Sequence, residues 1–370
     1  MVRLIVSLLC LCLASGAVSA RSSNTPPRPK LAVASNVTAG DGVLQLFQAY
    51  RPWNPLKETV AVGGETLMRR GRGCLLLVSR TAGTLSVVDT NPWKLRRTFD
   101  LGPGSEPVDV VPVDETRVLI SRAGATHLLL LNLRTGGSRE VVDLSDLADA
   151  DGVPDLGTMA RFGGRLFIQL RRIDQESGNP TTPCLAVVDL RTGALVDADP
   201  STPGTQGIKL KGTAPRFKMQ IFPNLGLLYV SSTGGFFDAG GLEVVNLRTL
   251  RSLGLVVRED SGNVGADLGA FKMITPRRGY LTYSTDLLLS SHLHEVRLVN
   301  DGFELGPQLH VSLDYFVPEI AYERGKDLIY VPDGTFGQMG VNVFRGEDGT
   351  RLTESPLPTD GMPTDLILFR

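Results

Sequence analysis

The sequence predicts an all-β protein built as a single seven-bladed β-propeller. Two observations support this prediction. Pairs of short apolar runs joined by turn residues return with a period of roughly 40–50 residues, which is typical of propeller blades. Nearly every run is rich in Val, Leu, Ile, Tyr or Phe and ends at Gly, Pro, Asn or Asp, as β-strands do. The second run of the pattern occurs seven times, at residues 42–47, 83–89, 126–132, 183–189, 241–246, 292–297 and 340–345.

The N-terminal residues 1–20 have the features of a signal peptide. Arg3 supplies the positive start, and residues 4–14 form an apolar stretch too short for an ordinary transmembrane helix. Small residues precede a cleavage site near Ala20, although a retained anchor is an alternative. Residues 21–30 form a polar, Pro-rich leader that we expect to be disordered. The propeller should therefore occupy residues 31–370 of a secreted or periplasmic protein that has no transmembrane segment.

The turns that follow the second runs repeat in sequence. Residues 133–136 and 190–193 both read Leu-Arg-Thr-Gly and follow Asn132 and Asp189. An Asn or Asp side chain accepts hydrogen bonds from the backbone two residues further on, and Gly supplies a positive φ. These turns should therefore join the two outer strands of each blade. The two tryptophans lie on equivalent hairpins, where we expect them to cap blade edges rather than to bind a ligand.

A further short run precedes each strand pair and often begins with Pro. Such runs are predicted to form the innermost strands of the blades; they occupy residues 107–111, 215–219, 318–321 and 363–367. The last copy has no partner strands after it, and the first blade lacks an inner strand before residue 31. We therefore expect residues 362–370 to complete the first blade, which closes the ring and removes exposed sheet edges.

Charge and cysteine content restrict the possible partners. The net charge is -1, so there is no basic excess to hold a phosphate backbone, and we expect no nucleic-acid partner. Beyond the signal peptide the only cysteines are Cys74 and Cys184, which lie in different repeats. A disulfide needs a close approach of the two Cα atoms, so we expect two buried thiols and no disulfide.

Several runs resemble the repeats of YVTN-type propellers. Residues 117–122, 227–232 and 327–331 are similar to the Tyr-Val-Thr-Asn core, and the Val-Val-Asp endings at 87–89 and 187–189 are similar to the next strand of that repeat. The resemblance covers nearly the whole mature chain and implies the same propeller fold. It implies no single function, because members include surface-layer, periplasmic and ligand-binding proteins.

Alignment of the inner strands places equivalent residues around the central channel. Five of these positions are charged, namely Asp109, Lys218, Lys272, Glu319 and Asp365, whereas Thr66 and Thr158 occupy the other two blades. One interpretation is a self-compensating ring of ion pairs. The other is a polar site for a small anionic or zwitterionic ligand, with the two lysines as its cationic side. Further charged residues lie just upstream, near the mouth: Glu106, Asp155, Arg216 and Asp267.

Two histidines could begin a metal site. His292 and His294 alternate along a predicted strand, so both side chains point to the same face. A metal or haem site would need at least one more ligand, and the spacing identifies none. An ordinary half-exposed strand face is the alternative interpretation.

The sequence does not identify a reaction. It contains no nucleophile elbow, phosphate loop, HExxH or EF-hand spacing, so no catalytic residue and no cofactor can be named. We favour an exported, monomeric, non-catalytic binding or interaction protein, with a small-molecule or protein ligand at one propeller face. The alternatives are a periplasmic cofactor- or metal-dependent oxidoreductase or hydrolase, and a subunit of a larger envelope assembly.

Overall fold

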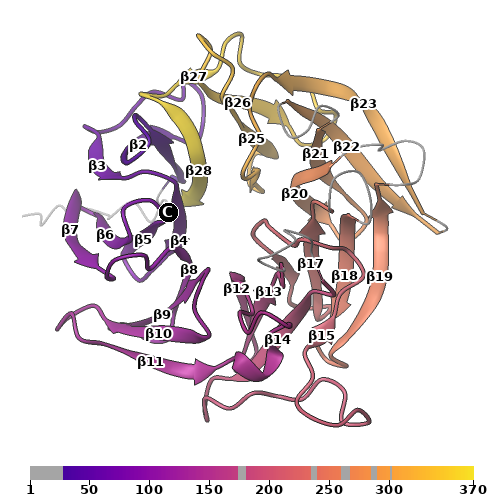
Figure 1. The fold of residues 1–370 in the computed structure, drawn as a ribbon. Helices are drawn as coiled ribbons and strands as arrows, with labels where there is room; N and C mark the ends of the chain where they lie inside the picture. The colour runs from indigo at the N-terminus through magenta and orange to yellow at the C-terminus, as the bar shows by residue number, and fades with distance from the viewer. Residues whose placement is uncertain (1–27, 174–180, 235–239, 260–266, 285–289, 301) are drawn as a thin grey trace, which may run out of the picture.

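A computed structural model describes residues 28–173, 181–234, 240–259, 267–284, 290–300 and 302–370. The described residues form seven four-stranded antiparallel sheets, arranged as blades around a common axis (Figure 1). The predicted seven-bladed propeller is therefore confirmed. The predicted signal peptide and residues 21–27 of the predicted leader lie outside the described residues, and Lys30 already begins the first strand.

Each blade contains four strands that follow one another from the axis outward. Blade 1 contains β28 (Met362–Phe369), β1 (Lys30–Asn36), β2 (Asp41–Gln48) and β3 (Val60–Gly63). Blade 2 contains β4 (Thr66–Arg70), β5 (Cys74–Ser79), β6 (Thr84–Thr90) and β7 (Trp93–Asp100). Blade 3 contains β8 (Pro107–Pro112), β9 (Arg117–Arg122), β10 (His127–Asn132) and β11 (Ser138–Asp143). Blade 4 contains β12 (Leu156–Phe162), β13 (Arg165–Leu170), β14 (Cys184–Asp189) and β15 (Ile208–Lys209).

The remaining three blades follow the same order. Blade 5 contains β16 (Gln220–Phe222), β17 (Leu227–Ser232), β18 (Gly241–Asn246) and β19 (Arg251–Arg258). Blade 6 contains β20 (Asp267–Thr275), β21 (Arg278–Ser284), β22 (Ser291–Val299) and β23 (Gly302–Ser312). Blade 7 contains β24 (Ala321–Glu323), β25 (Leu328–Asp333), β26 (Gly340–Arg345) and β27 (Leu357–Pro358). A single 3₁₀ turn, η1 (Ser145–Leu147), lies between blades 3 and 4.

The last strand closes the ring as the sequence predicts. β28 pairs antiparallel with β1, so that Leu31 lies opposite Leu368 and Ala34 opposite Asp365. Lys30 and Phe369 are also partners, so the ends of the described chain lie side by side. Blade 1 is thus made from both ends of the chain and has its own inner strand, like the other six blades.

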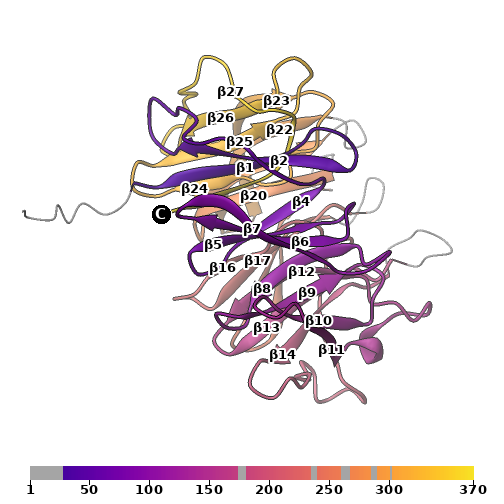
Figure 2. The same cartoon turned by 90° about the vertical axis from the view of Figure 1, so that its left-hand side faces the viewer.

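The strand directions define two faces of the propeller. Because neighbouring strands are antiparallel, the hairpins between second and third strands and the links to the next blade share one face, which we call the mouth face. The other hairpins and the C-terminus lie on the opposite face, called the back face, and Figure 2 shows the ring from the side.

The hydrophobic core lies between adjacent blades rather than at the axis. The described residues form seven apolar clusters, one in each gap between neighbouring blades. In the gap between blades 7 and 1, Leu31 and Val33 pack with Tyr330 and Val341. The Tyr330 hydroxyl also donates a hydrogen bond to the carbonyl of Ala49 in this gap. Each blade is therefore stabilised by both neighbours, which explains why its central strands are continuous apolar runs.

The predicted outer hairpin turns have the expected geometry. The Oδ1 atom of Asn132 accepts the N–H groups of Arg134 and Thr135, and Asp189 accepts the two equivalent N–H groups in blade 4. Gly136 follows with a φ of +83°. The recurring Leu-Arg-Thr-Gly sequence is thus explained by turn chemistry.

Two predicted inner strands begin later than expected. Residues 215–219 and 318–321 were expected to be strands, but β16 begins only at Gln220 and β24 at Ala321. In blade 5, the carbonyl of Phe217 accepts hydrogen bonds from the side chains of Thr158 and Gln169 in blade 4. That carbonyl is consequently not available to the ladder of its own blade. Lys218 and Glu319 therefore lie just before the inner strands of their blades.

Both remaining cysteines are buried in apolar clusters between blades. Cys74 lies between blades 2 and 3, and Cys184 lies between blades 3 and 4, and both are free. Burial raises the pKa of the Cys74 thiol, and burial raises the pKa of Cys184 to about 11.

We predict that neither thiol reacts with iodoacetamide at pH 8 in the folded protein. A thiol with a pKa of about 11 is ionised to only about one part in a thousand at that pH, and the protein around it blocks access. Mass spectrometry of the peptides containing Cys74 and Cys184 should show labelling only after denaturation in guanidinium. Labelling of Cys184 within minutes in the native protein would contradict this prediction.

Candidate functional site

Charged side chains from distant blades meet at the axis. The Lys218 Nζ atom, from blade 5, lies 2.6 Å from both carboxylate oxygens of Asp365 in blade 1. It also lies 3.5 Å from Oε2 of Glu319, which precedes β24 in blade 7. Blades 1 and 5 are not neighbours, so this ion pair crosses the axis of the propeller. Asp365 in turn accepts the backbone N–H of Met68 in blade 2.

A second ion pair joins blades 2 and 3 beside the axis. Arg69 donates from Nε to Oδ1 of Asp109 at 2.7 Å and from Nη2 to Oδ2 at 2.5 Å. Asp109 is fully buried and also accepts the N–H of Met159 in blade 4, at 2.7 Å. Asp109 and Asp365 therefore perform the same structural task, since each carboxylate accepts a backbone N–H from the following blade. The repeat pattern predicts Thr66 at the equivalent position of blade 2 and does not predict the role of Arg69.

Lys272 differs from the other charged residues around the axis. It is half-buried on β20, and its side-chain Nζ atom forms no hydrogen bond or ion pair within 4 Å to any described residue. Burial lowers the pKa of Lys272; the nearby Glu319 opposes this shift and Lys218 adds to it. The structure thus brings the predicted charged residues together, with three of the five in one ion-paired group. Their role as ligand contacts stays a prediction.

The two threonines at equivalent positions bind backbone groups. Thr66 Oγ1 donates to the carbonyl of Gly63 at 2.7 Å, and Thr158 Oγ1 donates to the carbonyl of Phe217 at 3.0 Å. Apart from Lys272, the side chains at the equivalent inner positions therefore form ion pairs or hydrogen bonds within the protein itself.

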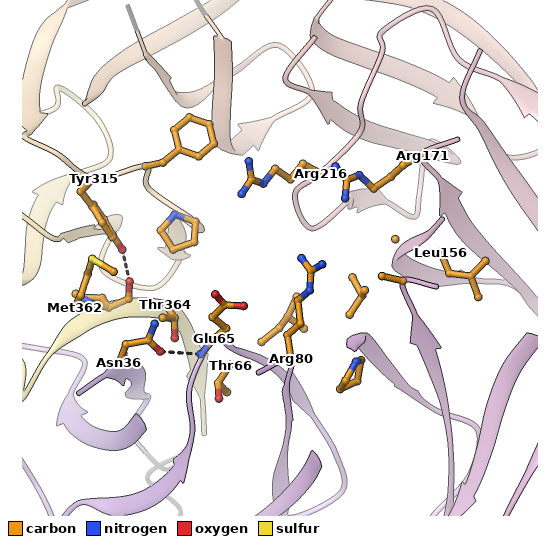
Figure 3. A pocket seen from close by; sticks show the side chains of 18 of the residues that line it. Asn36, Glu65, Thr66, Arg80, Leu156, Arg171, Arg216, Tyr315, Met362 and Thr364 are labelled. Carbon is orange, nitrogen blue, oxygen red and sulfur yellow. Dashed lines mark hydrogen bonds between the residues drawn. The ribbon is translucent and has the colours of Figure 1, made fainter. Parts of the chain in front are cut away.

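A pocket of about 480 Å³ opens on the mouth face, at the start of β4 and β28. Three arginines from different blades line it: Arg80 directly follows β5, Arg171 directly follows β13, and Arg216 precedes β16. Figure 3 shows the side chains of Arg171 and Arg216 along one side of the pocket, with Arg80 pointing toward the same space. We call this the arginine pocket.

The guanidinium groups in the arginine pocket are incompletely neutralised. Arg80 forms an ion pair of 2.9 Å with Glu106. Arg171 and Arg216 form no ion pair within 4 Å with any described residue, and the buried Nε atom of Arg171 has no hydrogen-bond partner among them. The guanidinium of Arg216 lies 5.6 Å from the centre of the Phe316 ring, a distance suited to a cation–π contact.

Burial and mutual repulsion act in the same direction on these arginines. Burial lowers the pKa of Arg171, and the charge of Arg216 lowers it further. The Arg216 side chain is exposed to solvent; partial desolvation of its guanidinium, together with the charge of Arg80, lowers the pKa of Arg216. The nearby carboxylate of Asp155 opposes the shift of Arg171 without reversing it, so the protein holds like charges close together with only partial compensation.

Carboxyl groups also line the arginine pocket. Asp155 is buried, its Oδ2 accepts the N–H of Ile173 at 2.7 Å, and burial raises its pKa. Glu65 lies on the opposite wall, where its backbone N–H donates to the side chain of Asn36 at 2.7 Å (Figure 3). The charge of Glu65 opposes the lowering of the pKa of Arg216 without reversing it. These carboxyl groups therefore offset the positive charge of the pocket only in part.

Sequence reasoning placed Arg216 near the mouth but missed Arg80 and Arg171. A signal for them exists, because Arg80 and Arg171 directly follow the second strands of blades 2 and 4, and Arg122 ends the second strand of blade 3. Arg122 instead pairs with Glu140 at 2.7 Å. The repeat therefore predicts the position of these arginines but not which of them stays unpaired.

The two candidate metal ligands lie on the same face of β22, as predicted, and both stack on Tyr283. The ring centres lie 5.7 Å from Tyr283 for His292 and 4.8 Å for His294. Their Nδ1 atoms contact the Gln308 side chain and the Gly306 carbonyl, and burial lowers the pKa of His294. Within the described ranges, no group of three His, Cys, Asp or Glu side chains is placed to hold a metal ion.

Solved structures with the same fold include two whose names are those of lactonases and one named AztD. The periplasmic gluconolactonase PpgL of Pseudomonas aeruginosa is 13% identical, with a TM-score of 0.62 over 92% of this chain and 99% of that chain. A putative 6-phosphogluconolactonase of Bacteroides uniformis is 12% identical, with a TM-score of 0.62 and the same coverage. AztD of Citrobacter koseri is 14% identical, with a TM-score of 0.51 over 92% of this chain and 97% of that chain.

These similarities establish the fold class alone. No family model matches the chain, and no curated protein sequence matches it. The resemblance to YVTN-type repeats is therefore supported as a seven-bladed propeller, while membership of that family stays a prediction. Among the described residues, no helix has the length and apolar character needed to cross a bilayer. The fold and the site define a β-propeller with an arginine-lined pocket at one mouth.

Proposed function

We propose that the protein is an exported, non-catalytic binding protein whose ligand carries a carboxylate or phosphate group held in the arginine pocket. The observation that carries this proposal is the convergence of Arg80, Arg171 and Arg216 from three blades, with two of them lacking an ion-pair partner among the described residues. Planar guanidinium groups match the geometry of carboxylates and phosphates and can bind them through two parallel hydrogen bonds.

A bound anion would offset the unfavourable electrostatics of the arginine pocket. It would accept the hydrogen bonds that Arg171 and Arg216 do not donate to described residues, and it would screen the repulsion that lowers the pKa of both arginines. The apolar part of the ligand would contact Leu156, Phe316 and Pro318, which also line the pocket. A volume of about 480 Å³ suits a small organic anion.

A binding role agrees with the contacts of two polar side chains in the pocket, because both already bond to backbone groups of the protein. The hydroxyl of Tyr315 donates to the carbonyl of Pro363, and the carboxylate of Asp155 accepts a backbone N–H. A hydrolase is the second candidate, because the raised pKa of Asp155 would suit a general acid beside an anion-binding group, and lactonases are among the proteins with this fold. Recovery of a bound ligand unchanged would favour binding over hydrolysis.

We predict that Arg171→Ala and Arg216→Ala each weaken binding of citrate or inorganic phosphate by about tenfold or more, because a charge-assisted hydrogen bond contributes about 1.5–3 kcal/mol. Isothermal titration calorimetry measures the affinity. Without ligand, Arg171→Ala should melt no lower than wild type, since the substitution removes a charge from a repulsive group, whereas Arg216→Ala also loses the contact with the Phe316 ring.

The matched control is the double variant Arg134→Ala/Arg191→Ala, which removes two exposed arginines from hairpins on the back face. It removes two positive charges, as the double pocket variant Arg171→Ala/Arg216→Ala would, and it should leave anion affinity unchanged. The proposal is contradicted if wild type binds neither anion at about 10 mM, or if the control loses affinity as much as the pocket variants do.

A further inference from the structure

Exposed apolar side chains gather on one sector of the mouth face. Four of the eight large apolar side chains that the described residues expose lie at the mouth-face ends of blades 1 and 7: Val37, Leu313, Phe336 and Met362. Phe336 is 92% exposed. The other four lie on outer strands or on the back face. We call the group of four the apolar rim.

Backbone and side-chain contacts hold the segments of the apolar rim together. The N–H of Leu313 donates to Oγ1 of Thr335 at 2.9 Å, which places the link before β24 against the hairpin that carries Phe336. The Tyr315 hydroxyl donates to the carbonyl of Pro363, directly after Met362. Gly361 packs against the backbone of Val37, since a Cβ atom added to this glycine would lie only 3.3 Å from the backbone N of Val37. The four side chains therefore lie on segments of which each contacts the next one around the mouth.

The apolar rim continues into the arginine pocket. Asp314 and Tyr315, which follow Leu313, line the pocket together with Met362. Figure 3 shows Tyr315 and Met362 on one side of the pocket, across from Arg216 and Arg171. The mouth face thus presents a cationic pocket on blades 2, 4 and 5 next to an apolar surface on blades 7 and 1.

We infer that the ligand of this face is an extended acidic peptide segment of another protein. Its carboxylate, from an Asp or Glu side chain or from a C-terminus, enters the arginine pocket, and its apolar side chains cover the apolar rim. This inference rests on the proposed anion-binding function and specifies the partner that supplies the anion.

Charge and exposure together favour this occupant. A free small anion would occupy the pocket and leave Phe336 in water, whereas a peptide joins both surfaces in one contact. Arginine clusters recognise acidic motifs, and apolar anchors beside them add affinity that does not depend on salt. Asp314 also lines the pocket, so its negative charge disfavours a carboxylate at that wall and favours the wall that carries the arginines.

The test uses a display library of short random peptides with free C-termini, selected on the wild-type protein. Enriched peptides should combine Leu or Phe with a nearby Asp, Glu or C-terminal carboxylate. One such peptide, labelled with fluorescein, is then measured by fluorescence anisotropy. The double variant Phe336→Ser/Leu313→Ser should weaken peptide binding by about tenfold or more, while the affinity for citrate stays unchanged.

Controls separate this inference from the proposed function. Leu225→Ser/Leu253→Ser removes two exposed apolar side chains far from the rim and should leave peptide binding unchanged. Arg171→Ala/Arg216→Ala should abolish binding of both peptide and citrate. All six substituted side chains reach solvent or line the pocket, and an unchanged circular dichroism spectrum checks that each variant folds.

Failure to enrich acidic and apolar peptides would overturn the inference, as would peptide binding that the apolar-rim variant does not weaken. If citrate binding still depends on the arginines in that case, the proposed anion-binding function stands without the peptide partner. If citrate does not bind wild type and peptides bind without any effect of the arginine variant, both proposals fail.

Discussion

A chain truncated after Gly361 is expected not to form the closed ring. The truncation removes β28, which supplies the inner strand of blade 1 and buries Leu366, Leu368 and Phe369. Burial of each such side chain contributes about 1.5–3 kcal/mol, and a folded domain is more stable than its unfolded state by only about 5–15 kcal/mol in total. The truncation also leaves β1 as an unpaired edge and exposes the face of Trp93 that stacks on Phe369, with ring centres 6.3 Å apart.

Thermal denaturation followed by circular dichroism measures this effect. The control lacks only Arg370, which is exposed and lies beyond the end of β28, and it should melt like the full chain. If the chain truncated after Gly361 melts cooperatively within a few degrees of wild type, pairing of β28 with β1 does not contribute to the stability of the ring.

Substitution of the two channel lysines by methionine should have opposite effects on stability. Lys218→Met leaves the buried carboxyls of Asp365 and Glu319 without their cation, and loss of one partner from a buried ion pair costs about 3–5 kcal/mol. Lys272→Met removes a half-buried cation that has no ion-pair partner among the described residues, so stability should stay the same or increase. Urea denaturation at pH 7 compares the two variants.

The loss caused by Lys218→Met should shrink as the pH falls. Burial raises the pKa of Asp365 above its ordinary value of 3.8, while Lys218 lowers it. Without the lysine, the folded-state pKa of Asp365 rises further above the unfolded value. A carboxyl with a raised folded-state pKa contributes stability below the unfolded pKa and loses it as the pH rises through the folded pKa.

The variant should therefore be closer to wild type near pH 4 than at pH 7. Equal destabilisation at both pH values would show that Asp365 does not take up a proton when its partner is removed. Equal destabilisation by Lys218→Met and Lys272→Met would show that the ion pair with Asp365 is not what distinguishes the two lysines.

The repeat pattern predicted the architecture well because blade formation depends on local features. Strand runs, Asn or Asp turns and inter-blade Pro residues are visible in the sequence, and counting them predicted both the seven blades and the closure by residues 362–370. The start of blade 5 was predicted less accurately, because the carbonyl of Phe217 bonds to side chains of blade 4. A contact between blades has no signature in the repeat itself.

The site was predicted less completely than the fold for the same physical reason. Positions at the axis could be aligned, and four of the five charged residues do form ion pairs there. However, Thr66 was expected at the axis in blade 2, and the residue of β4 that pairs with Asp109 there is Arg69, which lies further along the strand. An arginine at a strand end is neutralised only where another strand supplies a carboxylate. Glu140 neutralises Arg122 in this way. Sequence spacing cannot show such a pairing.

The pairing of β1 with β28 also has a consequence for how the chain folds. The partner strands of blade 1 are separated by nearly the whole length of the chain, so this sheet has a very high contact order. During synthesis the inner strand of blade 1 emerges after the strands of the other six blades, and until then the first blade is incomplete. The ring can therefore close only late, after the C-terminal strand has been made and can pair with β1.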